Sequence, residues 1–61
     1  MKKVLLIFHY YQSGKIRIEI YYINDERHRP IEDGPAVIWY DKNGQIYYEQ
    51  YWINGKIHSP K

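Results

Sequence analysis

Residues 14–30 read GKIRIEIYYINDERHRP and residues 44–60 read GQIYYEQYWINGKIHSP, and the two segments align without a gap at an offset of 30. The identical pairs are Gly14/Gly44, Ile16/Ile46, Glu19/Glu49, Tyr21/Tyr51, Ile23/Ile53, Asn24/Asn54, His28/His58 and Pro30/Pro60, with Tyr10/Tyr40 upstream. A period of this length is typical of a repeated supersecondary unit. The sequence therefore predicts one domain over residues 1–61, with repeat 1 at about 4–33 and repeat 2 at about 34–61.

Side chains alternate in character inside each copy. Residues 15–22 place Ile16, Ile18, Ile20 and Tyr22 on one parity and Lys15, Arg17, Glu19 and Tyr21 on the other. In residues 45–52, Ile46, Tyr48 and Trp52 keep the apolar parity, with Gln50 as an exception. Such alternation is typical of a strand with one buried face. No window has sustained helical periodicity, so we expect little or no helix.

A turn ending in glycine precedes each of these strands, at Gly14 and at Gly44. A type I turn followed by a left-handed glycine closes a hairpin with a G1 bulge. This turn would pair Tyr11 with Lys15 and Asp41 with Gln45. Counting outward gives the expected pairs Phe8–Ile18, Leu6–Ile20, Val4–Tyr22, Ile38–Tyr48 and Tyr40–Ile46. The even-numbered residues of four strands would then share one apolar face.

Further turns complete the predicted fold, an all-β antiparallel meander of β-hairpins. Asn54-Gly55 is typical of a type I′ turn. Asn24-Asp25 occupies the same place in repeat 1, where we expect a looser hairpin because Asp tolerates the left-handed conformation less well than Gly. The polar, proline-bearing residues 25–35 connect the two copies.

The first predicted strand is apolar on both parities. Val4, Leu6 and Phe8 would contribute to the core face, while Leu5 and Ile7 lie on the opposite one. A single sheet cannot cover its own face, because a domain needs two layers. We therefore expect self-association through these five residues, in which a second copy supplies a layer or continues the sheet. The alternative is a strongly curled monomer that closes on itself.

Composition excludes several classes of protein. The chain has no cysteine, which removes disulfides and thiolate sites, and a net charge of +2, which gives no single-sign field for nucleic acid. The apolar stretch from Val4 to Phe8 is shorter than a signal-peptide core, and no segment approaches a membrane span. We expect a cytoplasmic protein without a membrane association or a cofactor.

Two strings carry a family resemblance: Tyr51–His58, YWINGKIH, and Asp33–Ile38, DGPAVI. Together they resemble a variant MORN-type repeat, whose usual form is W-I-N-G-K-x-H-R, a spacer, and D-G-P-A before an N-G turn. Similar repeats occur in phage, large-virus and antitoxin-like bacterial proteins, and the resemblance implies hairpins laid side by side. This chain departs from the pattern at Asn24-Asp25-Glu26 and ends before a second D-G-P-A, which favours a compact self-associating form.

Candidate catalytic and metal-binding groups have simpler explanations. His28 and His58 are equivalent positions 30 residues apart, so they do not converge on a zinc ion. We expect each imidazole to pack on Tyr21 or Tyr51 and to bond a loop carbonyl. Glu19 and Glu49 recur at outward positions, where cross-strand polar partners account for them. The sequence therefore predicts a protein that is not an enzyme and has no metal site.

The odd-numbered face is rich in aromatic and basic residues. The candidate protein-binding residues are Tyr21, Trp39, Tyr47, Tyr51, Arg17, Arg27 and Arg29. Tyrosine and tryptophan are favoured at protein interfaces, because a rigid ring contributes area at low entropic cost. We expect a homodimer that binds an unidentified protein target, as a phage-encoded inhibitor of a bacterial defence protein or an antitoxin-like protein. The alternative is a single-stranded nucleic-acid-binding protein, since bases stack on such rings and basic side chains follow the phosphates.

Overall fold

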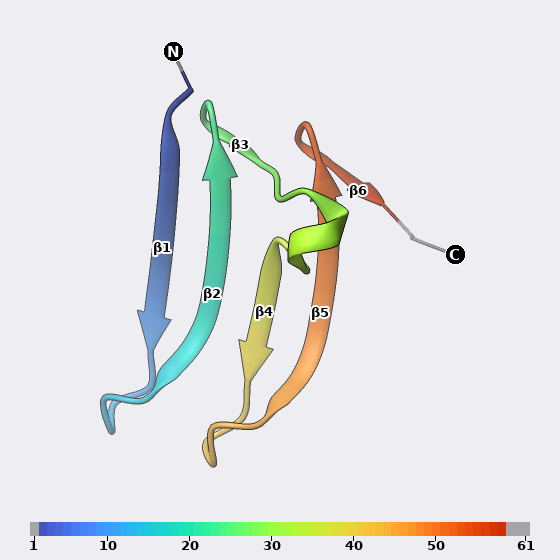
Figure 1. Cartoon of the computed structure of the whole chain (residues 1–61). Coiled ribbons are helices and arrows are strands. Elements are labelled where there is room, and N and C mark those ends of the chain that lie inside the picture. The colour runs from blue at the N-terminus through green and yellow to red at the C-terminus, as the bar shows by residue number, and fades with distance from the viewer. Residues whose placement is uncertain (1, 59–61) are drawn as a thin grey trace.

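The computed structural model describes residues 2–58 and consists of six antiparallel strands in one layer (Figure 1). The strands are β1 (Val4–Tyr10), β2 (Ile16–Ile23), β3 (Glu26–Arg27), β4 (Val37–Tyr40), β5 (Ile46–Ile53) and β6 (Lys56–His58). Their order across the sheet is β1-β2-β4-β5-β6, with β3 also paired to β2. The predicted all-β meander is confirmed. The only helical turn among the described residues is η1 (Ile31–Asp33), and no described helix could span a bilayer. Pro60, the predicted mate of Pro30, lies outside the described residues.

Strands β3 and β4 both lie between β2 and β5, and they pair with different parts of β2 (Figure 1). β4 pairs with β2 at residues 18–20, and β3 pairs with β2 at residues 22–23. Beyond β3, the Arg29 N–H donates to the Trp52 carbonyl at 3.2 Å, and the Gly55 N–H donates to the Arg27 carbonyl at 3.0 Å. The two repeats are therefore joined by the pairing of β2 with β4, and by backbone hydrogen bonds from residues 27–29 to the end of β5 and the turn that follows it.

Both predicted glycine turns form. The Tyr11 N–H donates to the Lys15 carbonyl at 2.8 Å, and the Gly14 N–H donates to the Tyr11 carbonyl at 2.9 Å. In repeat 2 the corresponding bonds, Asp41 to Gln45 and Gly44 to Asp41, measure 2.8 and 3.0 Å. The predicted pairings at these turns are thus confirmed.

Beyond the first turn, the predicted register of β1 is wrong by one residue. Ile18 stands opposite His9 rather than Phe8, and the shift lies between His9 and Tyr10. Phe8 instead faces Glu19, Leu6 faces Tyr21, and Val4 faces Ile23. The physical reason is a β-bulge in which Arg17 is the extra residue, because one inserted residue reverses the face of everything that follows.

Repeat 2 has the same bulge at the equivalent position. Tyr40 faces Ile46 as predicted, but Trp39 faces Tyr48 and leaves Tyr47 as the extra residue. Ile38 therefore lies opposite Glu49, and its predicted pairing with Tyr48 is wrong.

The bulges define two faces that mix odd and even residues. The register places Ile7, Ile18, Ile20, Val37, Trp39, Tyr48 and Trp52 on one side, called here the tryptophan face. Phe8, Tyr10, Glu19, Tyr21, Ile38, Tyr40, Glu49 and Tyr51 lie on the other, the glutamate face. The prediction that all even-numbered residues share one face is wrong for β1 and β4. Ile18 and Tyr48 do share a face, as expected.

The buried core is small and central. It consists of Ile20 in β2, of Ala36 just before β4, and of Val37 and Ile38 at the start of β4. The described part of the molecule measures 35 × 29 × 16 Å, so it is about one sheet and its side chains thick. Neither face has a second layer of strands or helices within residues 2–58.

The two other turns have equivalent backbones. Asn24 and Asp25 have φ values of 51° and 69°, and Asn54 and Gly55 have 50° and 81°. Two consecutive positive φ values define a type I′ turn. The turn at Asn24-Asp25 is therefore as tight as its glycine-containing counterpart, which is contrary to the looser hairpin expected.

Replacing Asp25 with glycine should stabilise the protein. Removing the left-handed strain outweighs the added freedom of the unfolded chain, by about 0.5 kcal/mol net. The substitution also loses the ion pair between Lys3 Nζ and Asp25 Oδ1 at 3.2 Å, which is exposed and contributes little. Urea unfolding of Asp25→Gly, with Asp25→Asn as a control for the lost charge, measures the effect. A lower free energy of unfolding for Asp25→Gly than for Asp25→Asn would contradict it.

Candidate functional site

The seven predicted surface residues lie on both sides of the sheet. Tyr21 and Tyr51 lie on the glutamate face, and Trp39 lies on the tryptophan face. Arg17 and Tyr47 are the two bulge residues. The structure therefore does not bring the predicted set together into one surface, because the bulges reverse the parity of β1 relative to β2 and of β4 relative to β5.

Glu19 is the centre of a polar cluster on the glutamate face. The Tyr21 hydroxyl donates to Glu19 Oε2 at 2.8 Å, and the Tyr40 hydroxyl donates to Glu19 Oε1 at 2.7 Å. The hydrogen bond to Glu19, followed by burial, raises the pKa of Tyr40 to about 12. Burial, followed by the bond to Glu19, raises the pKa of Tyr21. Both tyrosines therefore remain protonated donors at neutral pH, and the carboxylate has two partners.

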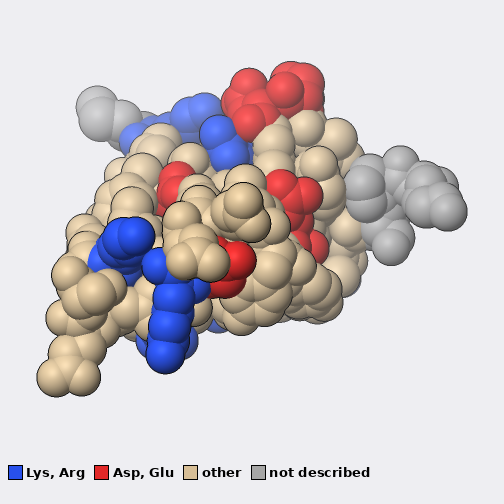
Figure 2. Space-filling model, turned by 90° about the horizontal axis from the view of Figure 1, so that it is seen from below, with Lys and Arg blue, Asp and Glu red and all other residues tan. Residues whose placement is uncertain are grey.

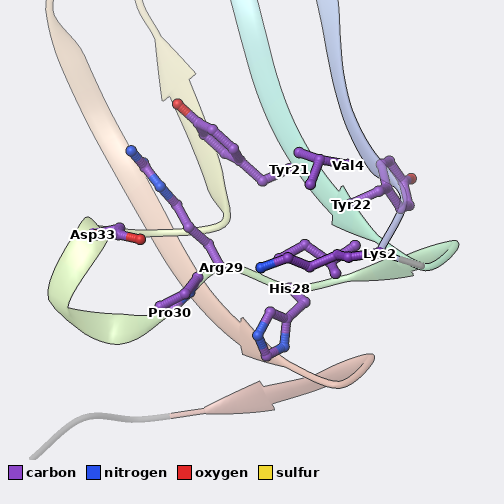
Figure 3. Close-up of a pocket in the computed structure, with 9 residues that line it drawn as sticks. Lys2, Val4, Tyr21, Tyr22, His28, Arg29, Pro30 and Asp33 are labelled. Carbon is purple, nitrogen blue, oxygen red and sulfur yellow. The ribbon is translucent and has the colours of Figure 1, made fainter.

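Arg29 packs against this cluster from the connection between the repeats. Its guanidinium lies 3.9 Å from the centre of the Tyr21 ring, and its Nη1 donates to the Pro35 carbonyl at 3.1 Å. Figure 3 shows Arg29 and Tyr21 alongside each other. A cation over an aromatic face is a favourable contact. The predicted binding residue Arg29 thus holds the connection on the sheet.

Arg27 also stacks on an aromatic ring, on the tryptophan face. Its guanidinium lies 4.9 Å from the Trp52 ring centre, and Trp52 Nε1 donates to Gln50 Oε1 at 3.0 Å. Two of the three predicted basic residues are therefore engaged with aromatic rings of the same chain.

His28 makes a hydrogen bond that differs from the one expected. Its Nδ1 accepts from the Asn54 N–H at 2.9 Å, so it bonds a turn amide of repeat 2 rather than a loop carbonyl. It also borders a shallow hollow beside Tyr21 and Pro30 at the end of β2 (Figure 3). No group of three metal-ligating side chains occurs within residues 2–58.

Exposed aromatic side chains gather around the bulge of repeat 2. Tyr47 is 62% exposed and Tyr48 is 52% exposed. The Tyr48 ring packs on Trp39, with ring centroids 5.1 Å apart and planes at 51°. We call Trp39, Tyr47 and Tyr48 the aromatic patch. Sequence parity predicts that Tyr48 lies on the core face with Ile18, and it does lie on that face, but no second layer within residues 2–58 covers it.

Glu19 should control the titration of Tyr40. In Glu19→Gln we expect the pKa of Tyr40 to fall from about 12 toward 10, because the carboxylate charge that favours the protonated phenol is removed. Absorbance at 295 nm, recorded against pH, follows phenolate formation. Glu32→Gln, at an exposed position in η1, is the control, and an unchanged tyrosine titration in Glu19→Gln would contradict the assignment.

The same hydrogen bond makes stability depend on alkaline pH. The phenol of Tyr40 loses its proton near pH 10.0 in the unfolded chain and near 12 in the folded one, so the unfolded state binds fewer protons between these values. The free energy of unfolding should be unaffected by Tyr40 below pH 10 and fall as pH rises toward 12. In Glu19→Gln that fall should be smaller, as urea unfolding at several pH values would show.

In comparisons with known proteins, the chain matches no family model, no curated protein and no solved structure.

Proposed function

We propose that this chain is a small protein-binding module without a catalytic role, and that it binds its target through the aromatic patch. The observation that carries the proposal is the exposure of Tyr47 and Tyr48 on β5, with the Tyr48 ring packed on Trp39. Interfaces favour such side chains over flexible ones. The bulge supports this role, since bulges re-aim side chains at functional sites.

A protein target is favoured over nucleic acid by the arrangement of charge. Arg27 and Arg29 already stack on Trp52 and Tyr21, which leaves those rings and guanidinium groups less available to bases and phosphates. Basic and acidic side chains are interspersed in the view of Figure 2, without an extended area of one sign. Nucleic-acid binders usually have a basic patch or stripe.

The biological setting proposed here rests on the resemblance of the repeat to MORN-type sequences. By that analogy, the module would be a phage-encoded inhibitor of a bacterial defence protein, or an antitoxin-like protein, in the host cytoplasm. Blocking another protein requires only a complementary surface, which a sheet bearing exposed rings offers.

The test compares two single substitutions in a pull-down from bacterial lysate. Wild-type protein and Ile57→Ser, which alters an exposed residue of β6, should each recover the same stoichiometric partner. Tyr47→Ser should recover at least tenfold less, because truncation of an aromatic residue at a binding hot spot costs about 2 kcal/mol or more. Absence of any partner, or equal recovery by Tyr47→Ser, would overturn the proposal.

A second measurement addresses the nucleic-acid alternative. Fluorescence titration with single-stranded oligonucleotides at low ionic strength should show no binding, since phosphate contacts are strongest there. Saturable binding that weakens as salt is added would replace the proposed function with the alternative.

A further inference from the structure

Strand β1 has the composition of an internal strand but lies at an edge. At the offset of 30, residues 6–10 of β1 correspond to residues 36–40, which are Ala36 and the whole of β4. The first three of these counterparts are buried between β2 and β5. In β1, by contrast, Val4 is 63% exposed and Leu5 and Leu6 are also exposed. An exposed apolar edge strand is a template for pairing with another chain.

Strand β5 has an open edge at the place where its repeat counterpart is paired. β2 lies between β1 and β4, and it pairs with β4 through Ile18, Glu19 and Ile20. The equivalent residues of β5 are Tyr48, Glu49 and Gln50. On the side away from β4, β5 pairs only with β6, at residues 51–53, so no described strand covers the outer edge at 48–50.

The backbone hydrogen-bonding groups of these two edges are complementary. The Tyr21 N–H donates to the Ala36 carbonyl at 2.8 Å, which by alternation directs the peptide groups of Glu19 toward Ile38 of β4. Glu49 is the repeat counterpart of Glu19, so its peptide groups point away from β4, toward the outer edge of β5. In β1, the bond from the Asn24 N–H to the Lys3 carbonyl at 2.7 Å directs Ile7 toward β2 and Phe8 outward. Glu49 and Phe8 therefore present free groups where Glu19 and Ile38 are paired.

The side chains are complementary in the same register. Within the chain, Tyr40 donates its hydroxyl to Glu19, one strand away. Glu49 has the place of Glu19 in repeat 2, and Tyr10 has the place of Tyr40 on β1. Tyr10 and Glu49 are both exposed, and neither side chain makes a hydrogen bond among the described residues. A strand β1 placed beside β5 would bring this donor to this acceptor.

We propose that β1 of a second copy of this chain pairs antiparallel with the outer edge of β5, with Phe8 opposite Glu49, His9 opposite Tyr48 and the Tyr10 hydroxyl on Glu49. In this head-to-tail contact, β5 of one molecule and β1 of the next pair as β2 and β4 pair within one chain. It defines the self-association of the proposed protein-binding module, and it extends the tryptophan face rather than covering it. In the assembly, His9 of the second copy would lie beside Tyr48, at the border of the aromatic patch.

Two backbone-blocked chains test the pairing directly, since a chain of 61 residues can be made by chemical synthesis. One carries an N-methyl group on Phe8 and the other an N-methyl group on Glu49, so each loses one outward donor and keeps its side chains. A chain N-methylated at Gln12, an exposed turn residue, is the control. Circular dichroism establishes that all three are folded, and sedimentation measures their mass.

The expected outcome is specific to head-to-tail pairing. Each blocked chain alone should sediment as a monomer of 7.5 kDa, and an equimolar mixture should form a species of twice that mass, because one chain supplies an intact β5 edge and the other an intact β1. The Gln12 control should associate like the unmodified chain. Monomers in the mixture, or association of either blocked chain alone, would overturn the proposal, as would an unmodified chain that is monomeric at high micromolar concentration.

Side-chain substitutions provide a test that leaves the backbone intact. Tyr10→Phe and Glu49→Gln should each weaken association about tenfold, as expected for loss of a hydrogen bond to a charged group. The double variant should be no weaker than the weaker single one, because both remove the same contact. Additive effects would contradict the pairing of Tyr10 with Glu49. These readouts need no target, so failure of the pull-down and failure of this inference are separately visible.

Discussion

Replacing Ile38 with alanine is expected to lower the free energy of unfolding by about 3 kcal/mol, since large-to-small changes of a buried isoleucine typically cost 2–5 kcal/mol. Ile38 is 7% exposed and lies in β4, with Glu19 of β2 and Glu49 of β5 on either side. The aliphatic side chain therefore separates two carboxylate-bearing positions at the centre of the sheet. No second layer in the described residues can collapse into the space that the substitution leaves.

The loss is large compared with the stability available to so small a domain. At about 0.05–0.15 kcal/mol per residue, a chain of this length has only a few kcal/mol in total. Ile38→Ala should thus be substantially unfolded at 37 °C, and urea titration followed by tryptophan fluorescence would show it. Ile46→Ala is the matched control, because Ile46 is 51% exposed in β5, and its cost should stay below about 1 kcal/mol. Equal effects of the two substitutions would refute the assignment of the core to β4.

The second large effect is expected at Gly34, which ends the η1 turn. Its φ of 121° and ψ of −172° lie in a region that essentially only glycine occupies. A Cβ atom there would also lie 3.0 Å from Arg29 Nη1. Gly34→Ala should therefore strain the backbone and displace the guanidinium from Tyr21, at a cost of about 3 kcal/mol for the two effects together.

Gly14→Ala separates these two contributions. Gly14 also has a positive φ, 97°, but a Cβ atom there would meet nothing within 4 Å. Its substitution should cost about 1–2 kcal/mol, from backbone strain alone. The tyrosine titration gives an independent readout, since Arg29 lowers the pKa of Tyr21 and Tyr40 and its displacement should raise both. Equal costs for the two glycines, with unchanged tyrosine titrations, would contradict the role given to Arg29.

The sequence was sufficient to predict the hairpins, because each depends on a short-range signal. Gly14 and Gly44 determine one kind of turn, and Asn54-Gly55 determines another. Their positions, combined with the repeat, predict the antiparallel meander of hairpins that the structure has. Backbone conformations that favour glycine are local, so a single sequence is enough to recognise them.

The two bulges could not be predicted in the same way. A register is specified by alternation only where one parity is apolar and the other polar. Val4 to Phe8 is apolar on both parities, so the strand satisfies either register equally well. Arg17 and Tyr47 recur at one repeat position, but nothing in their chemistry distinguishes a bulge residue from an outward-facing strand residue.

This limit explains why the candidate surface was only partly predicted. Tyr47 is exposed, as its outward parity predicts, whereas Trp39 is only half-exposed and Tyr48, predicted to lie in the core, is exposed. The pairing of Glu19 with Tyr40 was also missed, because it requires Ile38 rather than Trp39 to face Glu19 across the seam. Residue types could be read from the chain, but the side of the sheet on which each one lies depends on a single inserted residue.

The recurrence of the bulge has a consequence for how such a protein can change in length. Because Arg17 and Tyr47 interrupt their strands at the same point, the two hairpins carry the same irregularity at equivalent positions. Whole blocks of about 30 residues could be gained or lost by duplication or deletion while each repeat keeps its bulge at the same position. An insertion of any other length within a strand would place the bulge at a different position in that repeat than in the other one.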